Sequence, residues 1–280
     1  MSYKSILTIW DGKDSSVAAL KKAIALTITA CGHLHIICPA YITILQTQAY
    51  PYLDFPEDLK AEERERAKKT ADKLVAEAEK FAQEELMFFS TEVAVINRDQ
   101  LPDLMSQTAK FCDLAVFPRP FGADRTETDE KITESTLLTS DCPILIIPSD
   151  DTGHRETKAV IAWDGSVQSL RAVRLALPLL REASQVDVVI ITNTRRVTKE
   201  AEVSSDIATF LARHRINVEV NIIAKTSSSI SDIIRSHALD VGANLIVMGG
   251  YGHTPLREFF FGGPTRDMMQ DSKVPLFMAH

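Results

Sequence analysis

The C-terminal half of the chain alternates short apolar runs with segments whose apolar residues recur at helical spacing. Leu170, Val173 and Leu177 follow the three- to four-residue spacing of one helix face, whereas residues 159–163 and 245–248 are continuous apolar runs of strand length. This pattern predicts strands at Ala159–Trp163, Val186–Thr192, Asn217–Ile223, Leu245–Met248 and Pro275–Met278, and helices at Ser166–Leu180, Ala201–His214, Ile230–Val241 and Pro264–Met269. Short apolar strands joined by amphipathic helices are typical of a parallel sheet that is covered on both faces.

Three segments of this half resemble segments of the N-terminal half, and they occur in the same order. The matched pairs are Ile6–Leu26 with Val160–Leu180, Cys112–Gly122 with Ala243–Gly252, and Asp141–Pro148 with Lys273–His280. Ordered matches of this kind indicate a tandem duplication. We therefore expect an α/β protein of two tandem doubly wound domains, residues 1–149 and 156–280, each with a five-stranded, mainly parallel sheet.

The N-terminal copy is roughly 22 residues longer than the C-terminal copy between the first and second of these matches. We assign the additional residues to a loop at Ala40–Leu59, because its prolines and tyrosines interrupt both periodicities. The charged run Glu57–Glu85 that follows has apolar residues near helical spacing, which predicts a long surface helix.

Net charge, cysteine spacing and the length of the apolar runs limit the kinds of partner and the cellular location that we expect. A net charge of -7 argues against nucleic acid as the main partner, although it allows one bound nucleotide. The four cysteines have neither zinc-site nor disulfide-framework spacing, which suits a reducing compartment. We find neither a signal-peptide pattern nor an apolar run of about 20 residues, and so expect a cytoplasmic protein without a membrane partner.

The stretch "MGGYGHTPLREFFFGGPTR", residues 248–266, has glycines at two places where anions bind in such folds. Gly249, Gly250 and Gly252 follow a predicted strand, and the carboxyl ends of parallel strands form the ligand-binding edge of a doubly wound sheet. Gly262 and Gly263 precede a predicted helix, whose free N–H groups favour a phosphate. The alternative is that both clusters are ordinary glycine turns.

The spacing Gly249-x2-Gly252-x9-Gly262 resembles the nucleotide-binding motif G-x2-G-x9-G-(S/T) of the universal stress protein (UspA-like) family. Asp164 in "AWDGS" resembles the acidic residue after the first strand of that family, and "VPLFMAH" resembles its last strand. The resemblance covers nearly all of the chain as two copies. It implies the tandem form of the family, with the Rossmann-like fold of adenine nucleotide alpha hydrolases.

The resemblance also implies a ligand, ATP or another adenine nucleotide such as ADP or AMP, with or without Mg²⁺. The residues that it places at the nucleoside are Asp164, Thr192 and Asn193, and those that it places at the phosphates are Met248, Gly249, Gly250, Gly252, His253, Gly262, Gly263, Pro264 and Thr265. One departure weakens the case for a triphosphate. Gly263 stands where the family has Ser or Thr, and Pro264 after it lacks an N–H donor.

The N-terminal copy lacks this motif. Pro118 and Phe121 stand where Gly249 and Gly252 lie in the other copy. The segment 121–131 carries several carboxylates, which repel phosphates. We therefore interpret the N-terminal copy as a structural domain that binds no nucleotide.

Two other groups of residues are candidates for a functional role. His33 and His35 alternate on one face of a predicted strand, but without a third ligand we predict no metal site. Asp11 and Asp164 could be catalytic acids, yet no base at a fixed spacing accompanies them. Helix capping or a hydrogen bond to a ribose is the simpler interpretation.

Function is predicted from the resemblance as stress-response binding or signalling. ATP hydrolysis is expected to be slow at most, because the sequence has neither a Walker lysine nor an evident base. The resemblance further implies that the last strands, Pro143–Ile147 and Pro275–Met278, join the halves as a pseudo-dimer, and that two chains can form a homodimer. The alternatives are a ligand-free interaction module and an adenylating enzyme of the related architecture.

Overall fold

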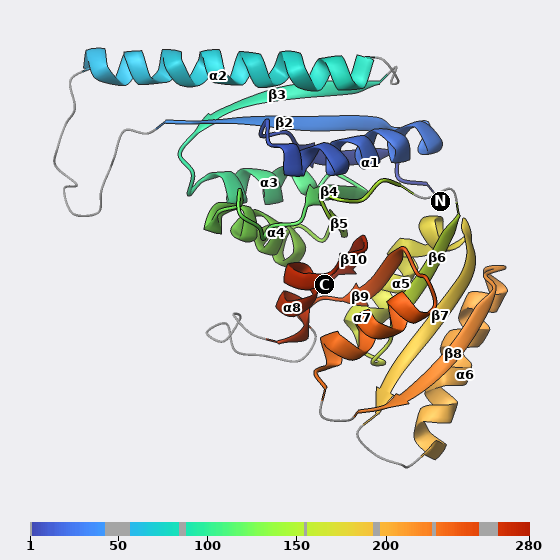
Figure 1. Ribbon diagram of the computed structural model, residues 1–280. Coiled ribbons are helices and arrows are strands. Elements are labelled where there is room, and N and C mark those ends of the chain that lie inside the picture. The colour runs from blue at the N-terminus through green and yellow to red at the C-terminus, as the bar shows by residue number, and fades with distance from the viewer. Residues whose placement is uncertain are drawn as a thin grey trace.

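Ten strands form one continuous sheet in the described part of the chain (Figure 1), with the order β3-β2-β1-β4-β5-β10-β9-β6-β7-β8. The computed structural model describes residues 2–42, 57–83, 88–153, 156–192, 197–225, 228–251 and 263–280. The N-terminal half comprises β1 (Ser5–Ile9), α1 (Asp14–Ala30), β2 (His33–Tyr41), α2 (Glu57–Gln83), β3 (Phe89–Ile96), α3 (Leu101–Ala109), β4 (Leu114–Pro118), α4 (Glu127–Thr139) and β5 (Ile144–Ile147). The C-terminal half comprises β6 (Thr157–Ala162), α5 (Val167–Leu180), β7 (Ala183–Thr192), α6 (Val197–Arg213), β8 (Val218–Ala224), α7 (Ile230–Asp240), β9 (Leu245–Gly249), α8 (Pro264–Asp271) and β10 (Leu276–Ala279).

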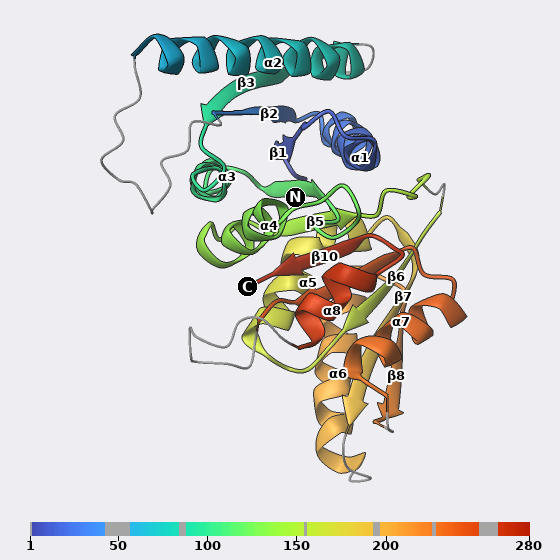
Figure 2. The same cartoon turned by 60° about the vertical axis from the view of Figure 1, so that its left-hand side comes forward.

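The two halves meet through their last strands. All neighbouring strands within each half are parallel, whereas β5 and β10 pair antiparallel, with Ile146 opposite Leu276 and Ile144 opposite Met278. Figure 2 shows these strands side by side, with one half of the molecule on either side of them. The predicted α/β fold and the predicted contact between the last strands are therefore confirmed.

The repeat seen in the sequence is also a repeat of contacts. Before β4, the Asp113 carboxylate accepts a hydrogen bond from the Lys4 N–H at 2.6 Å. Before β9, the Asn244 side-chain oxygen accepts one from the Lys158 N–H at 3.1 Å. Matched backbone bonds also join Trp10 N–H to the Ile37 carbonyl and Trp163 N–H to the Val189 carbonyl, each at 2.9 Å. Corresponding residues of the two copies therefore form corresponding hydrogen bonds between the strands.

The core has two apolar layers, one on each face of the sheet. Because side chains alternate along a strand, Ile6 and Leu7 enter opposite layers, as do Ile161 and Val160. Helices α1, α2, α5 and α6 cover one layer and α3, α4, α7 and α8 cover the other. Each layer contains residues of both halves, so that burial continues across the β5–β10 junction.

Helix α2 is the long surface helix that the charged run predicts, within the described residues. It presents Ala67, Ala71, Ala78 and Ala82 to the core. The loop predicted before it is wrong at both ends, since Ala40 belongs to β2 and Leu59 to α2, while residues 43–56 lie outside the described residues. The pairing of β2 with β3 continues past Pro39 as far as Tyr41, which lies opposite Ile96. None of the described helices has the length and apolarity to cross a membrane.

We predict that Phe277→Ala in β10 destabilises the whole chain strongly. Phe277 is fully buried in the layer shared by both halves, and truncating such a side chain costs about 3–5 kcal/mol. Phe111→Ala is the matched control, because Phe111 is 86% exposed and its loss should change stability by less than about 0.5 kcal/mol. Urea unfolding followed by circular dichroism measures both. Equal losses would contradict a core centred on the junction.

Candidate functional site

A pocket of about 220 Å³ lies at the carboxyl ends of β6 and β9, the edge of the sheet where the sequence predicts a ligand. One part of its described wall is apolar and is formed by Ala162, Trp163, Val189, Ile191, Ile230 and Ile234. The remainder is formed by strand ends, the loop after β9 and the start of α8, and comprises Asp164, Met248, Gly249, Tyr251, Gly263, Pro264 and Thr265. The pocket therefore offers an apolar slot beside a polar rim.

Asp164 stands at the turn between β6 and α5. Gly165 has a φ of 75°, which lets the chain turn sharply there. The Asp164 carboxylate accepts the Ser166 N–H at 2.9 Å, and the Ser166 hydroxyl caps α5 by accepting the Ser169 N–H at 3.1 Å. Asp164 thus helps to shape this turn, and its exposed side chain lines the pocket.

Gly249 ends β9 where the strand passes very close to the first turn of α5. A β-carbon at this position would lie 2.6 Å from the Ser169 nitrogen and 2.8 Å from the Gln168 carbonyl carbon. The glycine is therefore required by packing against α5, whereas the sequence suggested a freedom needed for anion binding. Its backbone still lines the pocket.

Gly250 is turned away from the pocket and toward the junction of the halves. Its N–H donates to the Ala279 carbonyl at 2.8 Å, and its carbonyl accepts from His280 Nδ1 at 3.0 Å. A β-carbon here would lie 2.7 Å from Leu137 of α4. The sequence placed Gly250 at the phosphates, but the structure places it at the contact with the N-terminal half.

The start of α8 faces the pocket without a side-chain cap. Gly263 is its N-cap residue, with a φ of 117°, and a glycine has no side chain with which to cap the helix. The Thr265 hydroxyl accepts the Tyr251 N–H at 3.3 Å, which ties the helix start to the loop after β9. Free N–H groups and the helix dipole make this end favourable for an anion.

The remaining predicted site residues lie beside the pocket or outside the described residues. Thr192 ends β7, and its carbonyl accepts the Lys225 N–H at 2.8 Å; its neighbour Ile191 lines the pocket and Thr192 does not. The predicted residues outside the described part are Asn193, Gly252, His253 and Gly262. The structure therefore brings together Asp164, Met248, Gly249, Gly263, Pro264 and Thr265.

Tyr251 connects the pocket to the N-terminal half through a contact that the sequence did not predict. Its hydroxyl donates to Glu134 Oε1 of α4 at 2.8 Å, and burial raises the pKa of the tyrosine. Beside this contact, Arg266 forms an ion pair with Glu130 at 2.9 Å and lies over the ring of Phe121. Tyr251 stands between two motif glycines, which was a signal, but Glu134 lies 117 residues away.

The matched carboxylate of the N-terminal half is occupied by an internal guanidinium. Arg125, whose side chain is only 2% exposed, donates to Asp11 at 3.0 Å and to Asp129 at 3.2 Å. Burial acts to raise the pKa of Asp11, but the Ser16 hydroxyl and the charges of Arg125 and Lys13 outweigh burial and lower it. The carboxylates of this segment that bond Arg125 are thus paired with a positive charge, which weakens the predicted repulsion of phosphates.

The two histidines of β2 have separate partners. His33 Nε2 lies 2.9 Å from the Ser90 hydroxyl, and His35 Nε2 lies 3.0 Å from the Glu92 carboxylate. Both partners are on the neighbouring strand β3. Among the described residues, no group of three or more metal-ligating side chains is present.

The comparisons agree with the resemblance stated from the sequence. Residues 157–280 match the model of the universal stress protein family. A universal stress protein from Archaeoglobus fulgidus DSM 4304 is 13% identical, with 98% of this chain and 95% of that one covered and a TM-score of 0.75. A functionally unknown protein from Pseudomonas aeruginosa PAO1 is 18% identical, with coverages of 99% and 92% and a TM-score of 0.60. At these identities the two structures support the fold over the full chain.

The remaining comparisons give weaker support for the fold or none. A universal stress protein solved in complex with cAMP is 16% identical and covers 54% of this chain and all of its own, but its TM-score of 0.30 supports no argument about this pocket. No curated protein matches the chain significantly by sequence.

We predict that Tyr251 and Glu134 are energetically coupled. Tyr251→Phe and Glu134→Gln should each cost about 1–2 kcal/mol, because each leaves a half-buried polar group with a poorer partner. The double variant should lose less than the sum, by about 0.5–1 kcal/mol or more. A double-mutant cycle by urea unfolding measures this difference. Additive losses would show that the halves are not coupled through this bond.

The pKa of Glu134 gives a second, pH-dependent prediction. Burial, with Glu130 nearby, raises this pKa above its usual value of 4.5, despite the hydrogen bond from Tyr251. The folded state then holds the proton more tightly than the unfolded state, so stability from this group falls as the pH rises above 4.5 toward the folded pKa. The stability cost of Glu134→Gln relative to the unmodified chain should therefore shrink as the pH rises from about 4 to about 7. Thermal melts of both proteins measure this. A difference in melting temperature that stays constant across this pH range would contradict the raised pKa of Glu134.

Proposed function

We propose that this chain, whose residues 157–280 form a domain of the universal stress protein family, binds an adenine nucleotide in the pocket between β6, β9 and α8. Stress-response binding or signalling is then its function, rather than catalysis. The observation that carries the proposal is the convergence of an apolar slot, a strand-end carboxylate and an uncapped helix start on one pocket.

The apolar slot and Asp164 suit the nucleoside. Trp163, Val189 and Ile191 form an apolar surface on which a flat ring such as adenine can be buried. The Asp164 carboxylate accepts hydrogen bonds, as a ribose hydroxyl requires, and an acidic residue near a strand end holds ribose in other doubly wound folds. Both features belong to the same part of the pocket wall, formed by the residues that follow β6 and by β7.

The start of α8 suits a phosphate. Gly263 has a backbone conformation that residues with a β-carbon rarely adopt, and nothing lies within 4 Å of its would-be β-carbon, so conformation and not crowding favours glycine there. Thr265 offers a hydroxyl in the first turn instead. At about 220 Å³ the pocket is smaller than the roughly 300–1,000 Å³ of most ligand sites, which favours AMP or ADP over ATP.

Mg²⁺, if it accompanies the nucleotide, would neutralise phosphate charge. Asp164 is the only carboxylate among the described lining residues. The ion would then be held mainly by phosphate oxygens and water, as is usual for Mg²⁺ with nucleotides.

We further propose that the units are residues 1–149 and 156–280 and that the first binds no nucleotide. The carboxylate of Asp11 is already bonded by Arg125, Ser16 and Lys13. A ribose hydroxyl would have to displace these bonds. A homodimer of the chain and its cytoplasmic location stay predictions.

The test compares one substitution at matched positions of the two copies. Asp164→Ala should weaken binding of AMP and ADP by about tenfold or more, because a hydrogen bond to a charged group is lost. Asp11→Ala should lower stability, because Arg125 loses a buried partner, but leave nucleotide affinity unchanged. Calorimetry at a temperature where both variants are folded, with native mass spectrometry for the bound mass, measures this.

The alternatives give different results. If neither calorimetry nor mass spectrometry detects a nucleotide on the unmodified chain, the proposal fails and a ligand-free interaction module is favoured. Release of pyrophosphate from ATP with a second substrate would instead favour an adenylating enzyme.

A further inference from the structure

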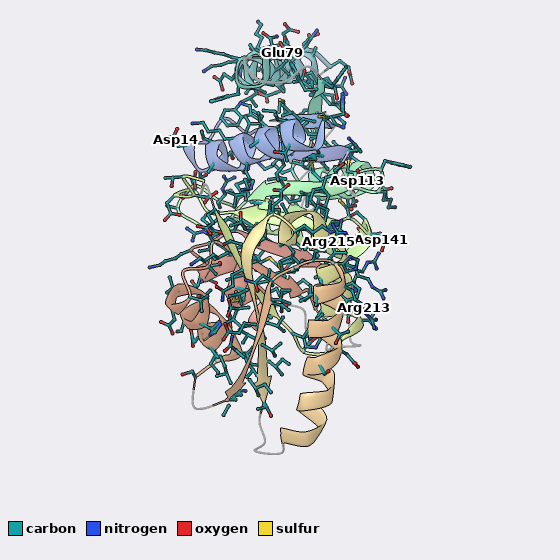
Figure 3. All side chains as sticks on the ribbon, turned by 90° about the vertical axis from the view of Figure 1, so that its right-hand side faces the viewer. Asp14, Glu79, Asp113, Asp141, Arg213 and Arg215 are labelled. Atoms are coloured by element: carbon teal, nitrogen blue, oxygen red, sulfur yellow. The ribbon has the colours of Figure 1, made fainter. Side chains whose placement is uncertain are left out.

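A basic concavity lies at the opposite edge of the sheet from the candidate pocket. The described residues that line it are Arg181, Arg213, His214 and Arg215, here called the arginine cluster, and its volume is about 440 Å³. Arg181 follows α5, while the others end and follow α6, just before the starts of β7 and β8. Figure 3 shows Arg213 and Arg215 together at the end of α6 that lies toward the N-terminal half.

The charge of the cluster is not compensated within the described chain. The chain as a whole carries a net charge of -7, so the cluster does not reflect a generally basic surface. Other arginines have carboxylate partners, such as Arg125 with Asp11 and Arg235 with Asp232. None of the three arginines of the cluster has one among the described residues. Holding three guanidinium groups around one concavity favours an anion between them.

The cluster is ordered by contacts of its own. Arg181 Nη2 lies 3.0 Å from His214 Nδ1. Because a guanidinium has no acceptor, the arginine donates, and His214 carries its proton on Nε2. The His214 ring packs edge-on against Phe210 with ring centres 4.7 Å apart. The histidine is therefore fixed in position and retains one N–H donor.

Arg215 occupies a backbone position that glycine normally takes. Helices α6 and α7 end in the same way: the Arg215 and Gly242 N–H groups bond the carbonyl three residues back, and the next N–H bonds the carbonyl five residues back. The corresponding φ angles are 64° for Arg215 and 65° for Gly242. A left-handed conformation is unfavourable for a residue with a side chain, so α6 ends less favourably than α7. The favourable interaction of a positive charge with the negative end of α6 explains why an arginine stands at position 213. It does not explain why an arginine stands at position 215, where the backbone conformation favours glycine.

We propose that the arginine cluster binds the phosphate group of a small soluble molecule. Guanidinium groups offer paired N–H donors that match the oxygens of phosphate, and several of them balance its double charge better than that of one carboxylate. Arg213 and Arg215 approach the anion from the end of α6, and Arg181 with His214 Nε2–H completes the donor set. The site is independent of the nucleotide pocket, which lies at the other ends of the strands.

The experiment is a titration of the full chain with inorganic pyrophosphate, followed through the side-chain Nε–H signals of Arg213 and Arg215 by NMR. These signals should shift and saturate, and added salt should weaken the binding. The double variant Arg213→Gln with Arg215→Gln should bind about tenfold more weakly or worse, as seen by calorimetry. Arg171→Gln with Arg174→Gln removes the same charge from the same half and should change the affinity little. Equal weakening by both pairs, or unshifted signals, would overturn the proposal.

A third variant separates binding from folding. Arg215→Gly removes the side chain but relieves the left-handed backbone, so the melting temperature should not fall while pyrophosphate binding weakens. A lower melting temperature with unchanged affinity would show instead that Arg215 is purely structural. Inorganic phosphate and a phosphate monoester, titrated in parallel, report whether the site needs more than one phosphate group; failure of all three would exclude the proposed class of ligand.

Discussion

The last strand of each half would, alone, leave a row of backbone N–H and C=O groups without partners at the edge of its sheet. Both strands are apolar and completely buried, so exposing them would cost hydrophobic burial as well as hydrogen bonds. Antiparallel pairing of β5 with β10 removes both edges at once and makes ten strands continuous. The direction of this one pairing places α4 beside Gly250, Tyr251 and α8, and the described contacts between the halves near the pocket depend on it.

The junction gives the N-terminal half a part in a site that it does not itself contain. Leu137 packs against Gly250, Glu134 accepts the Tyr251 hydroxyl, and Glu130 pairs with Arg266 just after the start of α8. The wall of the pocket that faces the other half is therefore held from outside its own domain. The C-terminal copy alone would lack these contacts, so the N-terminal copy contributes structural support to the pocket.

The sequence predicted what local periodicity and repetition determine: the order of strands and helices, the duplication and the edge at which the pocket lies. Apart from the pairing of the two last strands, which the resemblance implied, it did not predict contacts between residues far apart in the chain. Tyr251 with Glu134 and Arg125 with Asp11 are separated by 117 and 114 residues, and only the assembled sheet brings them together. Gly249 illustrates a different limit, since the sequence does not show whether a glycine is required for close packing or for anion binding. The family resemblance supplied the ligand class, which periodicity does not contain.

The bond between Arg125 and Asp11 has a consequence for how the two halves respond to their surroundings. A guanidinium that belongs to the chain is always present at its carboxylate, so the N-terminal half gains this interaction whatever the concentration of small molecules. Under the proposed function, the other half would instead gain stability from a nucleotide bound at the matched position, in proportion to the logarithm of nucleotide concentration. The N-terminal half then has the same resistance to unfolding and proteolysis at any nucleotide concentration. The resistance of the C-terminal half, and with it its lifetime, would vary with the nucleotide concentration of its surroundings.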